Sequence, residues 1–206
     1  MPLHLLDHPL AAHCLAVLRD RRTGPDAFRR HCERLTLLLA LEATRSLATE
    51  PTRVETPLES TEGVALAAPV VAVPILRAGL GMLPPLLELF PEVAVGYVGL
   101  ERDEATAVAH SYYRKFPPLH DRVVLLLDPM LATGGSADKA LAALAEAGAS
   151  DLRLLCIVAA PEGLAFLAER HPDVAIFAAA RDRCLNDRKF ILPGLGDFGD
   201  RLYGTL

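Results

Sequence analysis

The sequence predicts an α/β protein in which a mostly parallel sheet is flanked by helices. Apolar runs of strand length recur at residues 70–76, 123–127, 152–159 and 174–180. Amphipathic helical patterns at 136–147 and 162–170 separate the last three runs, and this alternation is typical of right-handed βαβ units. A chain of 206 residues fits a single domain over 1–206, in which we distinguish a helical arm at 1–50 and a tail at 181–206.

The N-terminal arm is expected to hold two helices. The first covers 10–22 and stops at Gly24-Pro25, and the second covers 26–47 with apolar residues such as Phe28, Leu35 and Leu39 at helical spacing. These helices precede the strands of the main sheet. They either form a contact between subunits or cover an edge of the sheet, and the sequence does not choose between the two.

The middle of the chain alternates strands and one helix. Strands are expected at 52–57, 70–76 and 93–100, and a helix at 82–90 has Pro84 and Pro85 in its first turn, where proline is tolerated. Residues 101–116 lack a helical face and end in Pro117-Pro118. We expect them to form a projecting β-hairpin with its tip near Glu104.

The C-terminal half continues the βαβ pattern. The strand at 123–127 precedes the helix at 136–147, which Gly148 terminates, and the strand at 152–159 precedes the helix at 162–170 and the strand at 174–180. The tail from Arg181 is rich in loops and in glycine, which gives the backbone the freedom that a ligand-binding loop needs.

Composition limits the classes of function. A net charge of −5 argues against a broad nucleic-acid interface. The N-terminus lacks a secretory signal pattern and no run of apolar residues is long enough to span a bilayer, so we expect a cytoplasmic protein with no membrane partner. The four cysteines (Cys14, Cys32, Cys156 and Cys184) are scattered without metal-binding spacing, and we expect no protein-only metal site.

The stretch 123–136, VVLLLDPMLATGGS, carries the strongest chemical signal. A buried strand runs into Asp128, and a glycine-bearing turn then leads into a helix. The turn amides and the helix N-terminus favour a phosphate, and the carboxylate can accept hydrogen bonds from sugar hydroxyls. The alternative is an ordinary strand-to-helix turn in which Ser136 is the N-cap of the helix.

Three further stretches are candidates for the same site. Arg77 follows an apolar strand and is able to clamp a phosphate, or else forms a surface ion pair. Arg102 could reach an anion from the hairpin, or belongs to a solvated charge run. The glycine-rich segment at 190–200 could bind a flat apolar ligand through its main chain, or is a turn with capping aspartates. No Ser-His-Asp or Cys-His arrangement is apparent.

Together these stretches resemble a known family. DPMLATGGS is similar to the motif by which type I phosphoribosyltransferases bind 5-phosphoribosyl 1-diphosphate (PRPP), in the form found in uracil phosphoribosyltransferases. PILRAGLGM, VAAPEG and PGLGDFGDRLYGT resemble that family in the same order, and with LLALEATRSL the resemblance covers nearly the whole chain. It implies the family's fold and the transfer of a phosphoribosyl group from PRPP to uracil, giving UMP and diphosphate.

The resemblance also implies roles for individual residues. Catalytic roles fall to Arg77, Asp128 and Asp197. PRPP would be bound by Arg77, Arg102, Asp128, Pro129, Met130, Leu131, Ala132, Thr133, Gly134, Gly135, Ser136 and Asp197. Uracil would be bound by Ile191, Gly196, Asp197 and Phe198. Mg²⁺ is implied as the counter-ion of PRPP, held mainly by the substrate, and a homodimer or larger homo-oligomer is implied as the assembly.

Two residues depart from the family pattern. Phe190 stands where tyrosine is usual, and Phe198 stands where alanine is usual. If the Phe198 ring turned toward the ligand, the base pocket would shrink. Two alternatives to uracil transfer therefore stay open: a regulator that binds PRPP without turnover, and a transferase for a different nucleobase.

Overall fold

The structure is a computed structural model that describes residues 1–102 and 109–205. The tip of the hairpin predicted at 101–116, near Glu104, lies outside the described residues. The elements in chain order are β1 (Leu3–Leu5), α1 (Pro9–Arg19), α2 (Pro25–Ala43), β2 (Thr49–Glu55), β3 (Ser60–Leu66), β4 (Val70–Leu76), the 3-10 helix η1 (Ala78–Met82), α3 (Leu83–Leu89), β5 (Ala94–Val95), β6 (Tyr97–Arg102), β7 (Ala109–Lys115), β8 (Val123–Leu127), β9 (Met130–Leu131), α4 (Gly135–Glu146), β10 (Asp151–Ala159), α5 (Pro161–Arg170), β11 (Ala175–Arg181), β12 (Cys184–Leu185), β13 (Ile191–Leu192) and α6 (Phe198–Tyr203).

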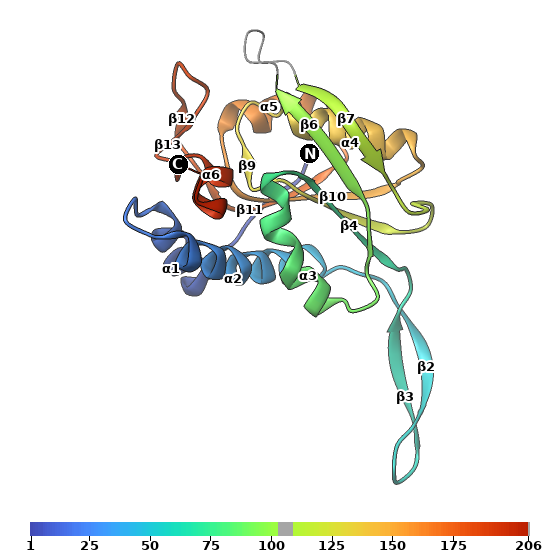
Figure 1. The fold of residues 1–206 in the computed structure, drawn as a ribbon. Coiled ribbons are helices and arrows are strands. Elements are labelled where there is room, and N and C mark those ends of the chain that lie inside the picture. The colour runs from blue at the N-terminus through green and yellow to red at the C-terminus, as the bar shows by residue number, and fades with distance from the viewer. Residues whose placement is uncertain (103–108, 206) are drawn as a thin grey trace.

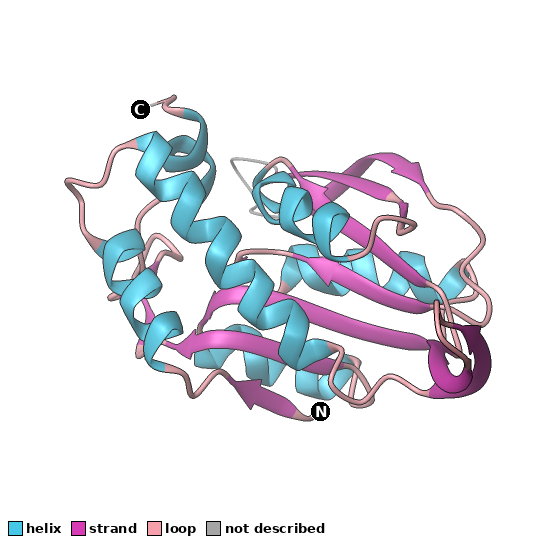
Figure 2. Ribbon diagram, turned by 90° about the horizontal axis from the view of Figure 1, so that it is seen from below, coloured by secondary structure: helices cyan, strands magenta, loops and turns pink. Residues whose placement is uncertain are grey.

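The main sheet has the strand order β1-β11-β10-β8-β4-β6-β7. Every neighbouring pair along this path is parallel except β6 and β7, which form an antiparallel hairpin. Helices lie on both faces of the sheet (Figure 2). The predicted α/β fold is confirmed, and so is a hairpin in this region. Its first strand begins at Tyr97, however, so that strand is mostly the one predicted at 93–100, and only its second strand lies wholly within the predicted 101–116.

Two apolar cores fill the space between the sheet and its helices. Successive side chains of a strand point to opposite faces, so Leu125 and Leu127 of β8 join the core beneath α1, α2 and α3, whereas Val124 and Leu126 join the core beneath α4 and α5. All five residues of β8 are buried, which is typical of a central parallel strand.

Helices α1 and α2 of the N-terminal arm pack on one face of the sheet (Figure 1). Both end earlier than the sequence predicted. Arg153 of β10 donates to the Ala43 carbonyl at 2.5 Å, and the Thr44 hydroxyl donates to the Ala40 carbonyl at 2.7 Å. These bonds satisfy the last carbonyls of α2, so the helix needs no further turn. Among the described residues, no helix has the length and apolarity needed to cross a bilayer.

A second hairpin escaped the sequence prediction. Strands β2 and β3 pair antiparallel over their full length, where we expected one short strand at 52–57. The hairpin projects away from the body of the molecule (Figure 1). Every residue of β2 is exposed, so neither face of the strand needs to be apolar. The sequence therefore lacks the alternation of apolar and polar residues that predicts a strand.

Shortening a side chain of the central strand β8 is expected to lower the stability of the fold strongly. Leu125→Ala should lower the free energy of unfolding by about 3 kcal/mol, because it leaves a cavity in a close-packed core. Leu41→Ala, at a position 54% exposed on α2, should change it by less than about 0.5 kcal/mol. Urea denaturation followed by circular dichroism measures both, and equal effects would contradict this account of the core.

Candidate active site

The carboxyl ends of β4 and β8 meet at a cavity of about 180 Å³. The two strands are parallel neighbours with Pro74 opposite Leu127, so the residues that follow them, Arg77 and Asp128, reach the same edge of the sheet. The cavity is lined by Ile75, Leu76, Arg77, Ala78, Leu100, Asp128, Met130, Ala132, Thr133, Gly134, Gly135, Ser136 and Ala137. The structure therefore joins the first two sequence candidates in one site.

The turn after Asp128 is held to β10 by main-chain hydrogen bonds. The Pro129 carbonyl accepts from the amides of Ile157 and Val158 at 3.0 and 3.1 Å, and the Leu131 carbonyl accepts from Ala160 at 2.8 Å. Pro129 and Leu131 are buried and do not line the cavity. They support the turn from beneath, while their neighbours face the open space.

Helix α4 begins at the wall of the cavity. Gly134 is its N-cap, with a left-handed φ of 85° that favours glycine, and Ser136 lies inside the first turn. The alternative in which Ser136 caps the helix is therefore wrong. The amides of the first helical turn and the positive end of the helix dipole lie at this wall, beside the hydroxyl groups of Thr133 and Ser136. Together these groups suit an anion.

Helix α5 lies directly behind this turn. A Cβ atom at Gly163 would lie 2.4 Å from the Ala132 carbonyl oxygen, and one at Gly134 would lie 2.9 Å from the Phe166 ring. The close approach of two backbones thus requires glycine at 163. The sequence did not predict Gly163 or Phe166 as contributors to the site, because no spacing rule links them to a turn about 30 residues away.

Asp138 ties α4 to the end of α5. Its Oδ1 accepts from Arg170 Nε at 2.7 Å and lies 2.8 Å from His171 Nε2. Burial acts to raise the pKa of this carboxyl, but the hydrogen bonds from Arg170 and His171 outweigh it, so the pKa lies below its ordinary value. Since Asp138 is in the first turn of α4, this contact holds the end of the helix that lies beside the cavity in place.

Arg77 lies in a tight turn between β4 and η1. The peptide bond between Leu76 and Arg77 is cis. Arg77 is exposed and lines the cavity at the edge of the sheet. A Cβ atom at Gly79 would meet the Leu127 carbonyl oxygen at 2.4 Å, so the turn lies against the end of β8. The Tyr203 hydroxyl donates to the Arg77 carbonyl at 3.3 Å, which brings the C-terminal helix beside this turn.

The tail residues predicted to bind uracil do not line the cavity of Arg77 and Asp128. The side chains of Ile191 and Phe198 are buried, and the Phe198 ring packs edge-on against Phe28 with centroids 5.2 Å apart. The ring therefore faces the core. Gly196 and Asp197 are exposed, and Asp197 is the N-cap of α6, where its Oδ1 accepts from the Asp200 amide at 2.9 Å.

Two other sequence-derived residues have simple placements. Phe190 is 46% exposed on the surface, near the β12–β13 pair. Arg102 ends β6, the strand that pairs with β4, and its side chain lies outside the described part of the structure.

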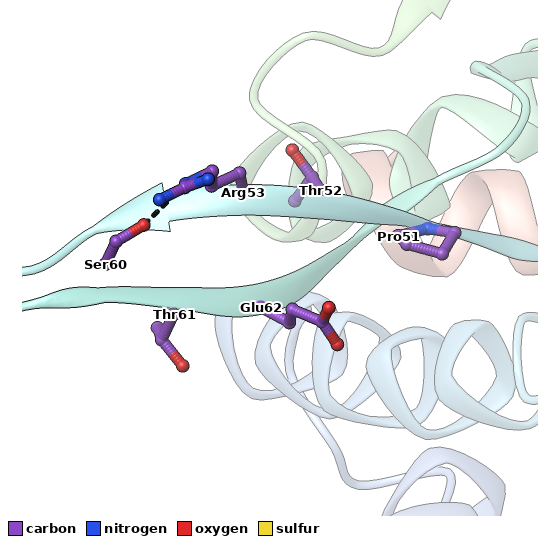
Figure 3. Close-up of a pocket in the computed structure, with 6 residues that line it drawn as sticks. All are labelled: Pro51, Thr52, Arg53, Ser60, Thr61 and Glu62. Atoms are coloured by element: carbon purple, nitrogen blue, oxygen red, sulfur yellow. Dashed lines mark hydrogen bonds between the residues drawn. The ribbon is translucent and has the colours of Figure 1, made fainter.

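A larger hollow of about 420 Å³ lies along the hairpin of β2 and β3 (Figure 3). It is lined by Pro51, Thr52, Arg53, Ser60, Thr61 and Glu62. Of these, Arg53 donates through Nε to the Ser60 hydroxyl at 2.6 Å, and only Ser60 is partly buried. The hollow brings no enclosed polar groups together, so the cavity at the sheet edge is the stronger candidate for an active site.

Solved structures share this architecture. A protein of Aquifex aeolicus superposes with a TM-score of 0.94 at 38% identity, over 98% of this chain and 97% of that chain. A hypoxanthine-guanine phosphoribosyltransferase from Bacillus anthracis is only 11% identical, and superposes with a TM-score of 0.53 over 77% of this chain and 80% of that one. The fold is that of the type I phosphoribosyltransferases.

Sequence comparison then gives the family. The family model described as uracil phosphoribosyltransferase matches residues 5–205, and the chain belongs to this family of pentosyltransferases. A uracil phosphoribosyltransferase from Thermus thermophilus is 50% identical over 207 residues, covering 100% of both chains. Another from Shouchella clausii is 47% identical over 205 residues, covering 98% of each.

Removing the Asp138 carboxylate is expected to destabilise the fold in a pH-dependent way. Asp138→Asn should lower the free energy of unfolding by about 1 kcal/mol at pH 7. A carboxyl whose pKa is lowered by folding stabilises the folded state above its unfolded value, here 3.8, and loses this contribution as the pH falls through the folded value. The difference between variant and wild type should therefore shrink toward pH 3.

Urea denaturation of both proteins between pH 7 and pH 3 measures that difference. Asp121→Asn is a matched control, because the Asp121 side chain is 86% exposed. Its positive φ of 56° is also tolerated by asparagine. A difference for Asp138→Asn that stays constant with pH would show that its carboxylate charge does not matter.

Proposed function

We propose that the protein transfers the phosphoribosyl group of PRPP to uracil, giving UMP and diphosphate. One observation carries the proposal: Arg77, Asp128 and the turn 132–136 line one cavity at the carboxyl edge of the sheet. Arginine, an acid and a row of helix-terminal amides are the groups that a sugar bearing both a phosphate and a diphosphate requires. Family membership gives the acceptor, since the relatives are named for uracil.

Each wall of the cavity has a part in binding PRPP under this proposal. The amides of Ala132 to Gly135 and the hydroxyls of Thr133 and Ser136 bind the 5-phosphate. Asp128 accepts hydrogen bonds from the ribose hydroxyls. Arg77 binds the diphosphate, and Arg102 reaches the same group from the hairpin of β6 and β7. Met130 lines the cavity beside the ribose, whereas Pro129 and Leu131 act by holding the turn against β10.

Catalysis then depends on position and charge. The bond between ribose C1 and the diphosphate oxygen breaks as uracil N1 bonds to C1, and positive charge develops on the sugar. The proton of N1 leaves to solvent or to the departing diphosphate. Under this proposal the Asp128 carboxylate stabilises that charge, and the Arg77 guanidinium stabilises the charge that gathers on departing diphosphate. The chain supplies no covalent nucleophile in this scheme. Asp197 orients the base from the tail.

A divalent cation fits this donor set only as a companion of the substrate. In the described part of the chain no group of three or more His, Cys, Asp or Glu side chains is placed to hold a metal. Asp128, Thr133 and Ser136 offer hard oxygen donors of the kind that Mg²⁺ prefers. When bound with PRPP, Mg²⁺ neutralises the charge of the diphosphate, and the residues named above do the positioning.

The tail would read uracil mainly through its backbone. Gly196 and Asp197 are exposed, whereas the rings that could narrow the site are elsewhere: Phe198 packs in the core and Phe190 on the surface. Ile191, whose side chain is buried, would contribute to the uracil site from beneath the tail. Since the Phe198 ring is buried against Phe28, it gives no reason to expect a base other than uracil.

The two cavity residues are expected to be essential for turnover. Asp128→Asn and Arg77→Ala should each lower kcat/KM by about 100-fold or more, because each removes charge that stabilises the transition state. Diphosphate release from PRPP and uracil, with and without Mg²⁺, measures the effect. Circular dichroism checks that the variants are folded.

Arg22→Ala is the matched control, since its side chain is 84% exposed in the turn that follows α1. Turnover like that of the wild type in both cavity variants would contradict the assigned roles. PRPP binding without any diphosphate release by the wild type would favour the regulator instead.

We also infer a homo-oligomer, with the hairpin of β2 and β3 as a contact. An isolated two-stranded hairpin is marginal in water, and this one exposes Leu58 at 94% and Val64 at 72%. A second copy of the chain would cover these side chains.

The four free cysteines suit a reducing compartment, and we place the reaction in the cytoplasm.

A charge on the hairpin is expected to weaken this assembly. Val64→Glu should shift the mass in solution toward the monomer, because burying an unpaired carboxylate is costly. Leu41→Glu, at an exposed position on α2, is the control and should leave the mass unchanged. Sedimentation velocity over a range of protein concentrations measures both, and identical profiles for Val64→Glu and wild type would exclude the hairpin as the contact.

A further inference from the structure

We propose that Arg19, Asp182 and Arg201 are positioning residues for the nucleobase. They hold the main chain of Gly194 and Leu195, the two residues directly before the exposed segment Gly196-Asp197. The inference rests on the proposed function, because it assumes that this segment receives uracil. None of the three residues lines the cavity of Arg77 and Asp128.

The loop between β13 and α6 needs external support. Gly194 and Gly196 have left-handed φ values of 59° and 82°, and a Cβ atom at Gly194 would lie 2.1 Å from the Ile191 carbonyl oxygen. The chain therefore turns sharply here and leaves the sheet ladder. Carbonyl and amide groups in such a turn are costly to bury without partners. Gly194 and Leu195 are both buried.

Asp182 and Arg19 hold the Gly194 residue from both sides. The Gly194 amide donates to Asp182 Oδ2 at 2.9 Å, and its carbonyl accepts from Arg19 Nη1 at 2.8 Å. The two side chains also form a bidentate ion pair, with contacts of 2.5 and 2.9 Å. Asp182 is 7% exposed, at the end of β11, and Arg19 ends α1. Both the donor and the acceptor of Gly194 are therefore tied to the rigid body of the fold.

Arg201 does the same for the next residue. Its Nη1 donates to the Leu195 carbonyl at 2.6 Å and also to the Leu18 carbonyl, and its Nη2 donates to the Asp20 carbonyl at 2.7 Å. The guanidinium lies 4.5 Å from the centroid of the Phe28 ring, which in turn packs on Phe198. The tail thus meets the end of α1 through the Arg201 side chain and meets α2 through the edge-on contact of Phe198 with Phe28.

The consequence is that the end of α1 controls the base-binding segment. A backbone that reads a planar base must present its N–H and C=O groups in one orientation before the base arrives. When neighbouring peptides are fixed, less conformational entropy is lost on binding. The carbonyls of Gly194 and Leu195 are already engaged by arginines, which leaves the following residues to face the ligand.

Conservative substitutions test this role. Arg19→Lys keeps the charge but loses the fork that spans Asp182 and Gly194, and Asp182→Asn keeps the shape but loses the charge. Each should raise the uracil KM about tenfold, while the dissociation constant for PRPP changes by less than about twofold, because the phosphate turn lies on other elements. Arg22→Lys, in an exposed ion pair with Asp20 just beyond the same end of α1, is the matched control.

Hydrogen exchange of the peptide 192–198 adds a readout that needs no substrate. It should be faster in Arg19→Lys and Asp182→Asn than in Arg22→Lys. If either variant fails to bind PRPP and is unfolded, Arg201→Lys takes its place, with the same expectations for the uracil KM and for exchange.

Three results would overturn the inference: an unchanged uracil KM, a PRPP dissociation constant that rises by the same factor as the uracil KM, or exchange at 192–198 that matches the control. Failure of the proposed function would look different, because the wild-type enzyme itself would then form no UMP from uracil.

Discussion

The parallel pairing of β8 with β4 and β10 is the constraint on which the rest of the structure depends. Parallel strands end at the same edge of a sheet, so the acid after β8 and the arginine after β4 reach one cavity. Burial on both faces of β8 fixes the register, because a slip by one residue would move each side chain to the opposite core. Core packing thereby sets the separation of the groups proposed to handle substrate.

Residues outside the proposed ligand contacts position those within them. Gly163 and Phe166 of α5 lie against the turn at the start of α4, and Asp138 links that helix to Arg170 and His171. The tail is held in a similar way by the end of α1. Both segments proposed to face the ligand are irregular, so their backbone groups need partners from elsewhere in the fold. This is why helices far apart in sequence flank the site.

Much of this architecture was predictable. Apolar runs and helical periodicity located the central strands and helices, and Asp128 with its glycine-bearing turn indicated a phosphate site from local pattern alone. Other features left no local signal. The hairpin of β2 and β3 is exposed on both faces, and the N-cap of α4 is Gly134 instead of Ser136 because the turn needs a left-handed residue first. The side chain of Phe198 could have faced either the ligand or the core.

The sequence by itself determined the order of the elements, the acid at the end of a buried strand and the glycine-bearing turn, since strand burial, turn geometry and helix starts depend on neighbouring residues. Only the tertiary structure decided that Arg77 and Asp128 share a cavity, that the Phe198 ring packs on Phe28, and that Arg19 meets Asp182 across 163 residues. These contacts join segments far apart along the chain. Their geometry follows from how the sheet and its helices pack, which no local pattern of residues encodes.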